Sequence, residues 1–366
     1  MNEKNLIKGY FQKNLGDDLF LKVFLERYKN YNFDMNSKYE YKDVLCDNEN
    51  IKIYNKKNLI IIIKAICNKF FKLIKSKKVI LLEDLKKYDN VITIGGSIFM
   101  EKDNMDFEIY KNSLFNSNCN NYIIGANFGP VRTKEYIKMH NDLIFPKIKD
   151  VCFRDKYSYD LFKELPNVRH ASDIVFTLDV SNVNITNSKK AIISVINVNK
   201  DGVEDNQIEY NKKIVELIQL LRKKKYNIVL MSFSKIQGDE AVIEQIISML
   251  EDKTCVEKYF YTGNIAEALN VLGDSQIIFG SRFHANILGL LLGKTVIPIA
   301  YSDKTINVFN DMNFKGKIFD IRNKENFDIK SLTDEDFSYR FDVSAQIKDA
   351  NRQFEKLDKI FYKEEK

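Results

Sequence analysis

The chain has 366 residues, of which 45% are hydrophobic and 30% are charged, and these values are typical of a globular protein long enough for two domains. Its formal net charge of +6 comes from interspersed acidic and basic residues. Such a weak positive charge does not indicate a nucleic-acid partner, whereas it suits anionic small molecules or loose contact with an anionic membrane surface.

The first half of the chain alternates short apolar runs with amphipathic segments. A weak strand, Leu6–Tyr10, precedes a helix that Asp17 and Asp18 open and that continues to about Tyr28. The next predicted elements are strand Ile51–Tyr54, helix Leu59–Ile74, strands Val91–Gly95, Tyr122–Gly125 and Asp150–Phe153, helix Tyr157–Leu165 and a short apolar run, Ile174–Phe176.

The pattern restarts after Asp179–Lys190, which is rich in Asn, Ser and Lys and is the best linker candidate. Strands that alternate with helices indicate parallel βαβ units. We therefore predict an α/β fold of two Rossmann-like domains, residues 1–180 and 190–340, whose parallel sheets face a cleft, and a C-terminal helix in 341–366. The elements predicted here are strands Ala191–Val198, Asn227–Ser232, Val256–Tyr261, Gln276–Gly280 and Thr295–Ile299, and helices Ile208–Arg222, Asp239–Leu250, Ile265–Leu272, His284–Leu292 and Ala345–Tyr362.

The apolar runs and the cysteines of the sequence indicate in which cellular compartment the protein acts. The most apolar run, Leu59–Cys67, is interrupted by Lys64 and is shorter than the roughly 20 apolar residues that span a bilayer, so we expect a buried helix. The N-terminus lacks the apolar core of a signal peptide. An odd, scattered set of cysteines without a C-x-x-C pair predicts reduced thiols in a cytoplasm. These cysteines are Cys46, Cys67, Cys119, Cys152 and Cys255.

Glycine, asparagine and small polar residues follow several predicted strands. Each could be ordinary turn chemistry. In a parallel sheet, however, these turns share the carboxyl edge, where ligands bind. Neither a G-x-G-x-x-G fingerprint nor a P-loop is present, which disfavours a nicotinamide enzyme. The candidate binding residues are Asn14, Gly16, Asp17, Gly95, Gly96, Ser97 and Asn127.

The segment Asp274–Asp303 holds the strongest candidates, because Ser281, Arg282 and His284 follow a predicted strand and begin a helix. On a strand-like segment Arg282 and His284 would project to one side. The guanidinium suits an anion, as does the adjacent helix N-terminus. His284 suits proton transfer near neutral pH. Further candidates for the anion site are Tyr301 and Lys304, after the next strand.

Arg154 directly follows a buried strand and has two interpretations. One is a salt bridge to Asp155 or Asp173, and the other is bidentate recognition of a carboxylate or phosphate. His140 and His170 are expected at the surface or behind the site. The residues alone therefore predict an anion-binding cleft with one proton-transfer group.

Six motifs resemble those of the polysaccharide pyruvyl transferase family, in the order of that family and from about Asn5 to Met312. The R-x-H and R-D-x-x-S elements are the more specific of them. The motifs are N-L-G-D-D (14–18), I-G-G-S (94–97), F-R-D-K-Y-S (153–158), A-S-D-I-V-F (171–176), G-S-R-F-H-A (280–285) and I-A-Y-S-D-K (299–304).

This resemblance implies a fold similar to GT-B glycosyltransferases and transfer of pyruvate from phosphoenolpyruvate to sugar hydroxyls of a surface polysaccharide or its lipid-linked precursor. It implies that Arg154 and Arg282 hold the donor and that His284 is the acid/base. The N-terminal domain would bind the glycan acceptor. Phosphoenolpyruvate would be a co-substrate, and no cofactor, metal or nucleic acid is expected. Contact with the inner face of a membrane and homo-oligomer formation stay open.

Two alternatives stay open. The chain could be a GT-B glycosyltransferase that uses a nucleotide sugar, with Arg282 on the diphosphate. It could also be a non-catalytic subunit of a glycan assembly system.

Overall fold

The computed structural model describes residues 3–37, 44–45, 49–54, 88–102, 119–199, 207–323 and 326–362. Contacts between residues divide the chain into two compact units, and each unit takes one segment from the other end of the sequence. Unit 1 comprises Met1–Gln12, Phe24–Ala171 and Gln353–Lys366, and unit 2 comprises Lys13–Val23 and Ser172–Arg352.

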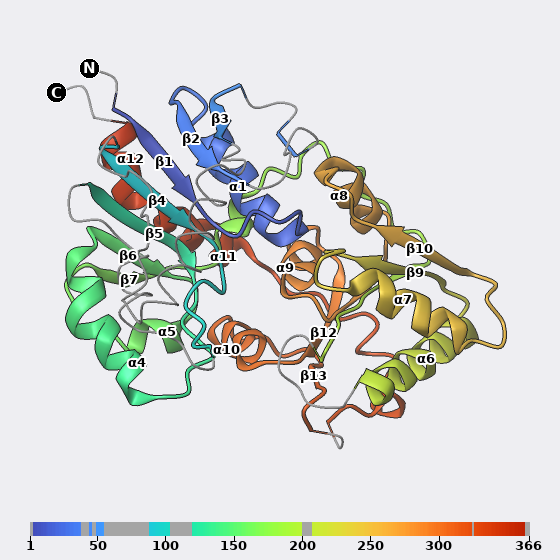
Figure 1. The fold of residues 1–366 in the computed structure, drawn as a ribbon. Helices are drawn as coiled ribbons and strands as arrows, with labels where there is room; N and C mark the ends of the chain where they lie inside the picture. Colours follow the sequence, from blue (N-terminus) through green and yellow to red (C-terminus); the bar gives the residue numbers. More distant parts are fainter. Residues whose placement is uncertain are drawn as a thin grey trace, which may run out of the picture. The chain divides into compact units, whose positions relative to one another are not determined.

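Unit 1 contains a seven-stranded parallel sheet in the order β3-β2-β1-β4-β5-β6-β7 (Figure 1). The register of β5 and β6 shifts between Ile123 and Ala126, and Gly125 at this bulge has a positive φ of 72°. The strands are β1 (Asn5–Lys8), β2 (Phe33–Asn36), β3 (Ile51–Tyr54), β4 (Asn90–Ile94), β5 (Asn120–Ala126), β6 (Asp150–Phe153) and β7 (Val168–His170).

Unit 2 contains a six-stranded parallel sheet in the order β10-β9-β8-β11-β12-β13. Its central strands are buried on both faces, as expected for a parallel sheet covered by helices. The strands are β8 (Lys190–Ser194), β9 (Asn227–Ser232), β10 (Val256–Phe260), β11 (Ile277–Gly280), β12 (Thr295–Ala300) and β13 (Phe319–Asp320). Two parallel α/β sheets confirm the predicted fold class.

The helices follow the strands in the alternation that the sequence predicts. The α-helices of the described residues are α1 (Leu15–Arg27), α4 (Lys134–Met139), α5 (Lys156–Asp160), α6 (Gln207–Lys223), α7 (Asp239–Ser248), α8 (Ile265–Gly273), α9 (Phe283–Leu291), α10 (Asp303–Asp311), α11 (Ser344–Ala350) and α12 (Glu355–Phe361). The predicted C-terminal helix is thus two α-helices joined by a 3-10 turn, Asn351–Phe354, and the apolar run after Asp173 is a 3-10 helix, Ile174–Thr177.

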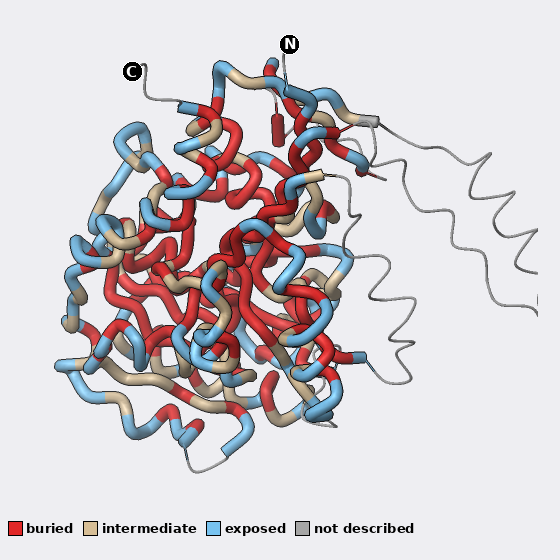
Figure 2. Tube along the Cα trace, turned by 90° about the vertical axis from the view of Figure 1, so that its left-hand side faces the viewer, coloured by how far each residue is buried: buried red, intermediate tan, exposed pale blue. Residues whose placement is uncertain are grey.

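Each unit has its own hydrophobic core beneath its sheet. Figure 2 shows long stretches of buried chain in red, with exposed segments in pale blue around them. In unit 2, aliphatic side chains of β8, β9 and β11 pack against α6 and α7. The core of unit 1 is unusually aromatic, with Phe99, Phe128, Phe145, Phe153 and Phe162 in one cluster. These cores fix the strand ends that carry the candidate residues.

His140 lies inside the aromatic core of unit 1, so the first of its two expected places, the surface, is wrong. Its ring is fully buried, and Nδ1 lies 2.8 Å from the backbone oxygen of Tyr136. We therefore assign the proton to Nδ1, which donates to that carbonyl. Burial lowers the pKa of His140 to about 4, so the imidazole is neutral near pH 7.

The predicted helix Leu59–Ile74, which includes the most apolar run, lies outside the described residues. Among the helices that are described, none combines the length and the apolar character needed to cross a bilayer.

Candidate active site

The turn between β11 and α9 is shaped by Gly280 and Asn286. The side chain of Asn286 is buried, and its Nδ2 donates to the backbone oxygens of Gly280 (2.9 Å) and Arg282 (3.3 Å). A Cβ at Gly280 would overlap the Asn286 amide. Glycine at the strand end therefore allows the sharp turn that puts Arg282 at the N-cap of α9 and His284 in its first turn.

The structure corrects the basis on which Arg282 and His284 were paired. Strand alternation does not apply to them, because the helix begins at Phe283. The two side chains contact different groups of unit 2. Both still lie at the carboxyl end of β11 and at a helix N-terminus, where the peptide dipoles favour an anion.

Arg282 is buried and held by the carboxylate of Asp239. Its Nε donates to Asp239 Oδ2 (3.0 Å), its Nη2 donates to Asp239 Oδ1, and its Nη1 donates to Gln237 Oε1. The backbone N–H of Arg282 donates to Ser194 Oγ (3.1 Å), at the end of β8. Hydrogen bonds therefore fix both the backbone and the guanidinium of Arg282.

His284 lies between the first turn of α1 and Asp173. Nε2 is 3.7 Å from Asp173 Oδ2, and the ring meets the ring of Phe20 edge-on with centroids 5.0 Å apart. Asp173 is itself fixed, because its Oδ1 accepts the N–H of Val175 (2.9 Å). On the other side, Gly16 faces Nδ1, and only a glycine leaves room for the ring. Asp173 and Gly16 thus define the position of the imidazole.

Two hydrogen bonds stabilise the start of α1: one caps the helix, and the other joins it to the residue after β9. The Asn14 side chain accepts the N–H of Gly16 (3.0 Å), as an N-capping residue does. The backbone N–H of Leu15 donates to the oxygen of Phe233 (3.1 Å), after β9. Asn14 and Gly16, both predicted to bind substrate, thus serve the helix start and the packing of His284, and Asp17 lies in the same first turn.

Asp18 is a fully buried carboxyl group in this turn. Tyr261 donates its hydroxyl to Asp18 Oδ2 (2.8 Å), while Oδ1 has no hydrogen-bond partner among the described residues. Burial raises the pKa of Asp18 to about 8, although the bond from Tyr261 opposes the shift. Near neutral pH, Asp18 therefore carries a proton.

Asp18→Asn is expected to make the free energy of unfolding less dependent on pH. The unfolded chain loses this proton near 3.8 and the folded protein near 8, so the folded state binds more protons between these values. The contribution of Asp18 to stability is thus largest below pH 3.8 and is lost as the pH rises to about 8. Urea unfolding should show the wild type losing up to about 1.4 kcal/mol per pH unit relative to the variant. A difference that is constant with pH would contradict this assignment.

The other candidates of unit 2 are close to their predicted places. The Ser281 hydroxyl is buried and lies 2.8 Å from the hydroxyl of Tyr210. The two hydroxyl groups therefore form a hydrogen bond within the core. Tyr301 is buried after β12, and the ammonium group of Lys304 lies 4.7 Å from the centre of its ring. This geometry is a cation–π contact. The roles of these residues in binding stay predictions.

In unit 1, Arg154 is brought together with two of the predicted turns. Its Nη2 donates to Asn127 Oδ1 (2.8 Å), and Ser97 donates its hydroxyl to the same oxygen (3.2 Å). A Cβ at Gly96 would lie 2.6 Å from Arg154 Nη2, so the guanidinium packs directly on this glycine, next to Gly95. The carboxyl ends of β4, β5 and β6 thus form one polar cluster around a buried arginine.

Gln353 stabilises the sheet edge that carries Arg154. Its buried side chain accepts the N–H of Gly125 (3.0 Å) at the bulge and donates to the backbone oxygens of Phe153 (3.3 Å) and Ala171 (2.8 Å). The Gly125 N–H lies at the bulge, where the ladder between β5 and β6 is disrupted, and an unpaired N–H of this kind is costly when buried. A residue near the C-terminus thereby supports the strand ends of unit 1.

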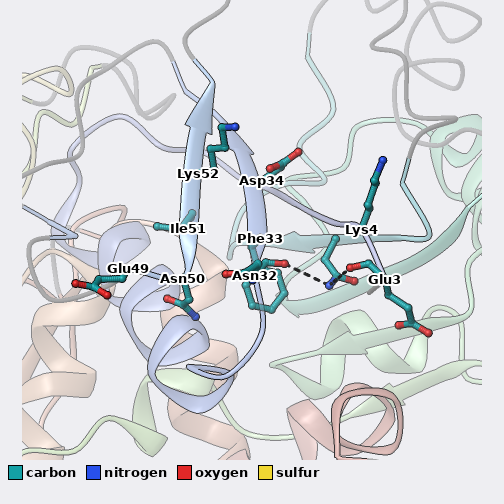
Figure 3. Close-up of a pocket in the computed structure, with 10 residues that line it drawn as sticks. Glu3, Lys4, Asn32, Phe33, Asp34, Glu49, Asn50, Ile51 and Lys52 are labelled. Atoms are coloured by element: carbon teal, nitrogen blue, oxygen red, sulfur yellow. Dashed lines mark hydrogen bonds between the residues drawn. The ribbon is translucent and has the colours of Figure 1, made fainter. Parts of the chain in front are cut away.

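A pocket of about 370 Å³ lies elsewhere in unit 1 (Figure 3). Its lining includes Asn5, Asn32 and Asn50, at the amino ends of β1, β2 and β3. The side chain of Asn5 donates to the backbone oxygens of Glu3 (3.3 Å) and Asn32 (3.4 Å). None of the predicted site residues lines this pocket. Because ligands of parallel sheets bind at the carboxyl ends, we assign it no role in catalysis.

Comparison with known proteins places the chain in a family. A family model described as polysaccharide pyruvyl transferase matches residues 14–303, which is most of the sequence. The chain belongs to the polysaccharide pyruvyl transferase family. The resemblance seen in the motifs is thereby confirmed.

A curated relative agrees with this family assignment. The amylovoran biosynthesis protein AmsJ of Erwinia amylovora is 21% identical over 264 residues, which cover 66% of this chain and 63% of AmsJ. The match therefore spans less than two thirds of the length of that relative.

Solved structures share the fold. A putative UDP-N-acetylglucosamine 2-epimerase from Listeria monocytogenes gives a TM-score of 0.62 at 14% identity and covers 99% of this chain and 98% of its own. The S. aureus protein MnaA, solved with UDP, gives a TM-score of 0.61 at 13% identity, and the match covers 99% of this chain and 97% of MnaA. At such low identity these likenesses show the GT-B-like fold alone.

Several residues around Arg282 and His284 were not singled out from the sequence. Gln237 and Asp239, which hold Arg282, lie at the start of α7 and gave no signal beyond ordinary helix-start chemistry. Asp18 and Asp173 stand in two of the quoted motifs, but Asp18 was given a role as a helix opener and Asp173 as a possible partner for Arg154. Among the described residues, no group of three His, Cys, Asp or Glu side chains forms a metal site.

Proposed function

We propose that this pyruvyl transferase family member transfers pyruvate from phosphoenolpyruvate to hydroxyl groups of a polysaccharide or its lipid-linked precursor. The observation that carries the proposal is the start of α9, where a fixed guanidinium, Arg282, and an imidazole beside a carboxylate, His284, follow one buried strand. No cofactor is invoked besides the co-substrate. The scattered cysteines favour a cytoplasmic reaction, with lipid-linked acceptors at the inner membrane face.

The chemistry requires one anion site and one proton-transfer group. The methylene carbon of phosphoenolpyruvate gains a proton, and a sugar hydroxyl attacks the resulting oxocarbenium-like carbon and loses its own proton. Phosphate then leaves, and a second hydroxyl of the sugar closes the cyclic ketal and gives up a proton to the departing phosphate. The net reaction joins the donor and a diol and releases one phosphate.

In this scheme His284 delivers the proton to the methylene carbon and accepts one from the attacking hydroxyl. Asp173 Oδ2, 3.7 Å from Nε2, places a carboxylate beside this imidazole. Arg282 offsets the negative charge of the donor, because a buried guanidinium suits a carboxylate or phosphate. A role of Arg154 in donor binding stays a prediction. Holding the reactants in place contributes further to the rate.

The proposal is tested by phosphoenolpyruvate-dependent release of phosphate across a panel of saccharide and lipid-linked acceptors. We expect release only when an acceptor with two suitably placed hydroxyls is present, in a fixed ratio to the ketal formed. Release that needs no acceptor, or no release with any of them, would count against the proposal.

A nucleotide-sugar glycosyltransferase is the second candidate, since the fold is shared with a protein solved with UDP. Thermal shift separates the two. A higher melting temperature with phosphoenolpyruvate, and not with UDP- or CMP-sugars, is the expected result. Stabilisation by a nucleotide sugar alone would favour the second candidate.

A further inference from the structure

The carboxylate of Asp239 accepts four hydrogen bonds, two from backbone N–H groups and two from Arg282. It is the first residue of α7, and its side chain is fully buried. Oδ2 accepts the backbone N–H groups of Phe233 (2.9 Å) and Ser234 (3.0 Å), which directly follow β9. The same oxygen accepts Arg282 Nε (3.0 Å), and Oδ1 accepts Arg282 Nη2. One carboxylate thus joins the end of β9, the start of α7 and the start of α9.

This arrangement fixes the direction of the guanidinium. Arg282 starts from the end of β11, with its backbone N–H on Ser194 at the end of β8, and reaches to Asp239 beyond β9. Its side fork, formed by Nε and Nη2, meets the carboxylate with parallel hydrogen bonds, the geometry of strongest arginine recognition. A flexible arginine would lose side-chain entropy on binding a ligand, whereas this one is already ordered.

We propose that Asp239 is a positioning residue, which orients Arg282 for the anionic donor. This inference rests on the proposed function, because it assumes that Arg282 binds the donor. Two bonds to backbone N–H groups hold the carboxylate in place without Arg282. Asp239 is therefore a fixed support for the guanidinium rather than a counter-ion that a substrate displaces.

Asp239→Asn tests this role with little change to the fold. An amide oxygen at the Oδ2 position keeps the bonds from the backbone N–H groups of Phe233 and Ser234, while the amide NH₂ at the Oδ1 position opposes Nη2 and prevents the paired bonds from Nε and Nη2. The guanidinium must then turn. We expect kcat/KM for phosphoenolpyruvate to fall on the order of 100-fold, as misplacement of a binding group does. Asp239→Glu, which keeps the charge but moves it, should not restore the rate.

Asp150→Asn is the matched control. Asp150 is also buried, and its two oxygens accept Arg169 Nε (2.7 Å) and Nη2 (2.8 Å) at the amino end of β6. The Asp150→Asn variant should lose about as much stability as Asp239→Asn and keep kcat/KM near the wild-type value. If Asp239→Asn and Asp150→Asn change kcat/KM equally, the positioning role is overturned. Tighter binding of phosphoenolpyruvate by Asp239→Asn with unchanged kcat would also overturn it, since that is the behaviour of a displaceable counter-ion.

Two readouts do not depend on turnover. Nitrogen-15 NMR of the Arg282 Nε–H should show slow hydrogen exchange in the wild type and fast exchange in Asp239→Asn. Calorimetry with inorganic phosphate should show weaker binding in the variant. If the wild type releases no phosphate from phosphoenolpyruvate, the proposed function fails. The positioning role is then supported by these changes and overturned if exchange and phosphate binding equal those of the wild type.

Discussion

Replacing His284 with asparagine is expected to lower kcat by roughly 10²- to 10⁴-fold, the range that general acid–base groups contribute. Asparagine keeps a polar side chain but cannot exchange a proton near neutral pH. The partly buried ring lies between Gly16 and Asp173, so its loss removes the proton-transfer group without removing a main part of the core. Steady-state phosphate release from phosphoenolpyruvate with an accepted saccharide measures the effect.

His170→Asn is the control, because this partly buried histidine lies on β7 in unit 1. It should leave kcat within about twofold of the wild type. Asp173→Asn should lower kcat less than His284→Asn does, because the imidazole stays while its carboxylate neighbour is neutralised. A His284→Asn variant that keeps more than about a tenth of wild-type kcat would show that another group transfers the proton.

Gly16→Ala is expected to lower kcat/KM on the order of 100-fold while changing stability little. The added Cβ would overlap His284 Nδ1 and lie 2.8 Å from its Cγ and 2.9 Å from its Cε1. The helix cannot simply withdraw, because Leu15 and Asp18 are bonded to Phe233 and Tyr261. The imidazole must therefore move. Alanine also favours the helix by up to about 1 kcal/mol over glycine, which offsets part of the clash.

Gly273→Ala separates this effect from a general loss of packing. At the end of α8, a Cβ on Gly273 would lie 2.7 Å from the oxygen of Asn184 and 2.8 Å from Val183 Cγ1, also in unit 2. This variant should lose stability and keep kcat/KM. Kinetics and urea unfolding of both variants decide the matter. Equal losses of activity in the two would show that Gly16 has no special relation to His284.

The elements of the fold could be predicted where apolar runs are strong. Strand β9, Asn227–Ser232, occupies the predicted residues, and β8, β11 and β12 differ by a few residues at their ends. Strand β2, Phe33–Asn36, was missed because F-D-M-N has only two apolar residues and is defined by pairing with β1 and β3. The exchange of end segments between the units also follows from long-range contacts, which no local pattern contains.

The residues proposed for the site stood out in the sequence, but the side chains that contact them did not. Arg282 and His284 stood out because charged and titratable side chains follow a buried strand. Their supports are distant in sequence: Asp239 for Arg282, and Gly16 and Asp173 for His284. A single sequence gives the types of these residues but not which of them lie close together. Only the structure shows that Gly16 leaves room for the imidazole of His284.

Carbon-13 NMR can show whether phosphoenolpyruvate is the donor. The protein is incubated with phosphoenolpyruvate labelled at its central carbon and with an accepted saccharide. We expect this carbon to become bonded to two sugar oxygens and a new methyl group, with one phosphate released for each ketal. An unlabelled saccharide, together with sugar transfer from a UDP- or CMP-sugar to the same acceptor, would contradict it.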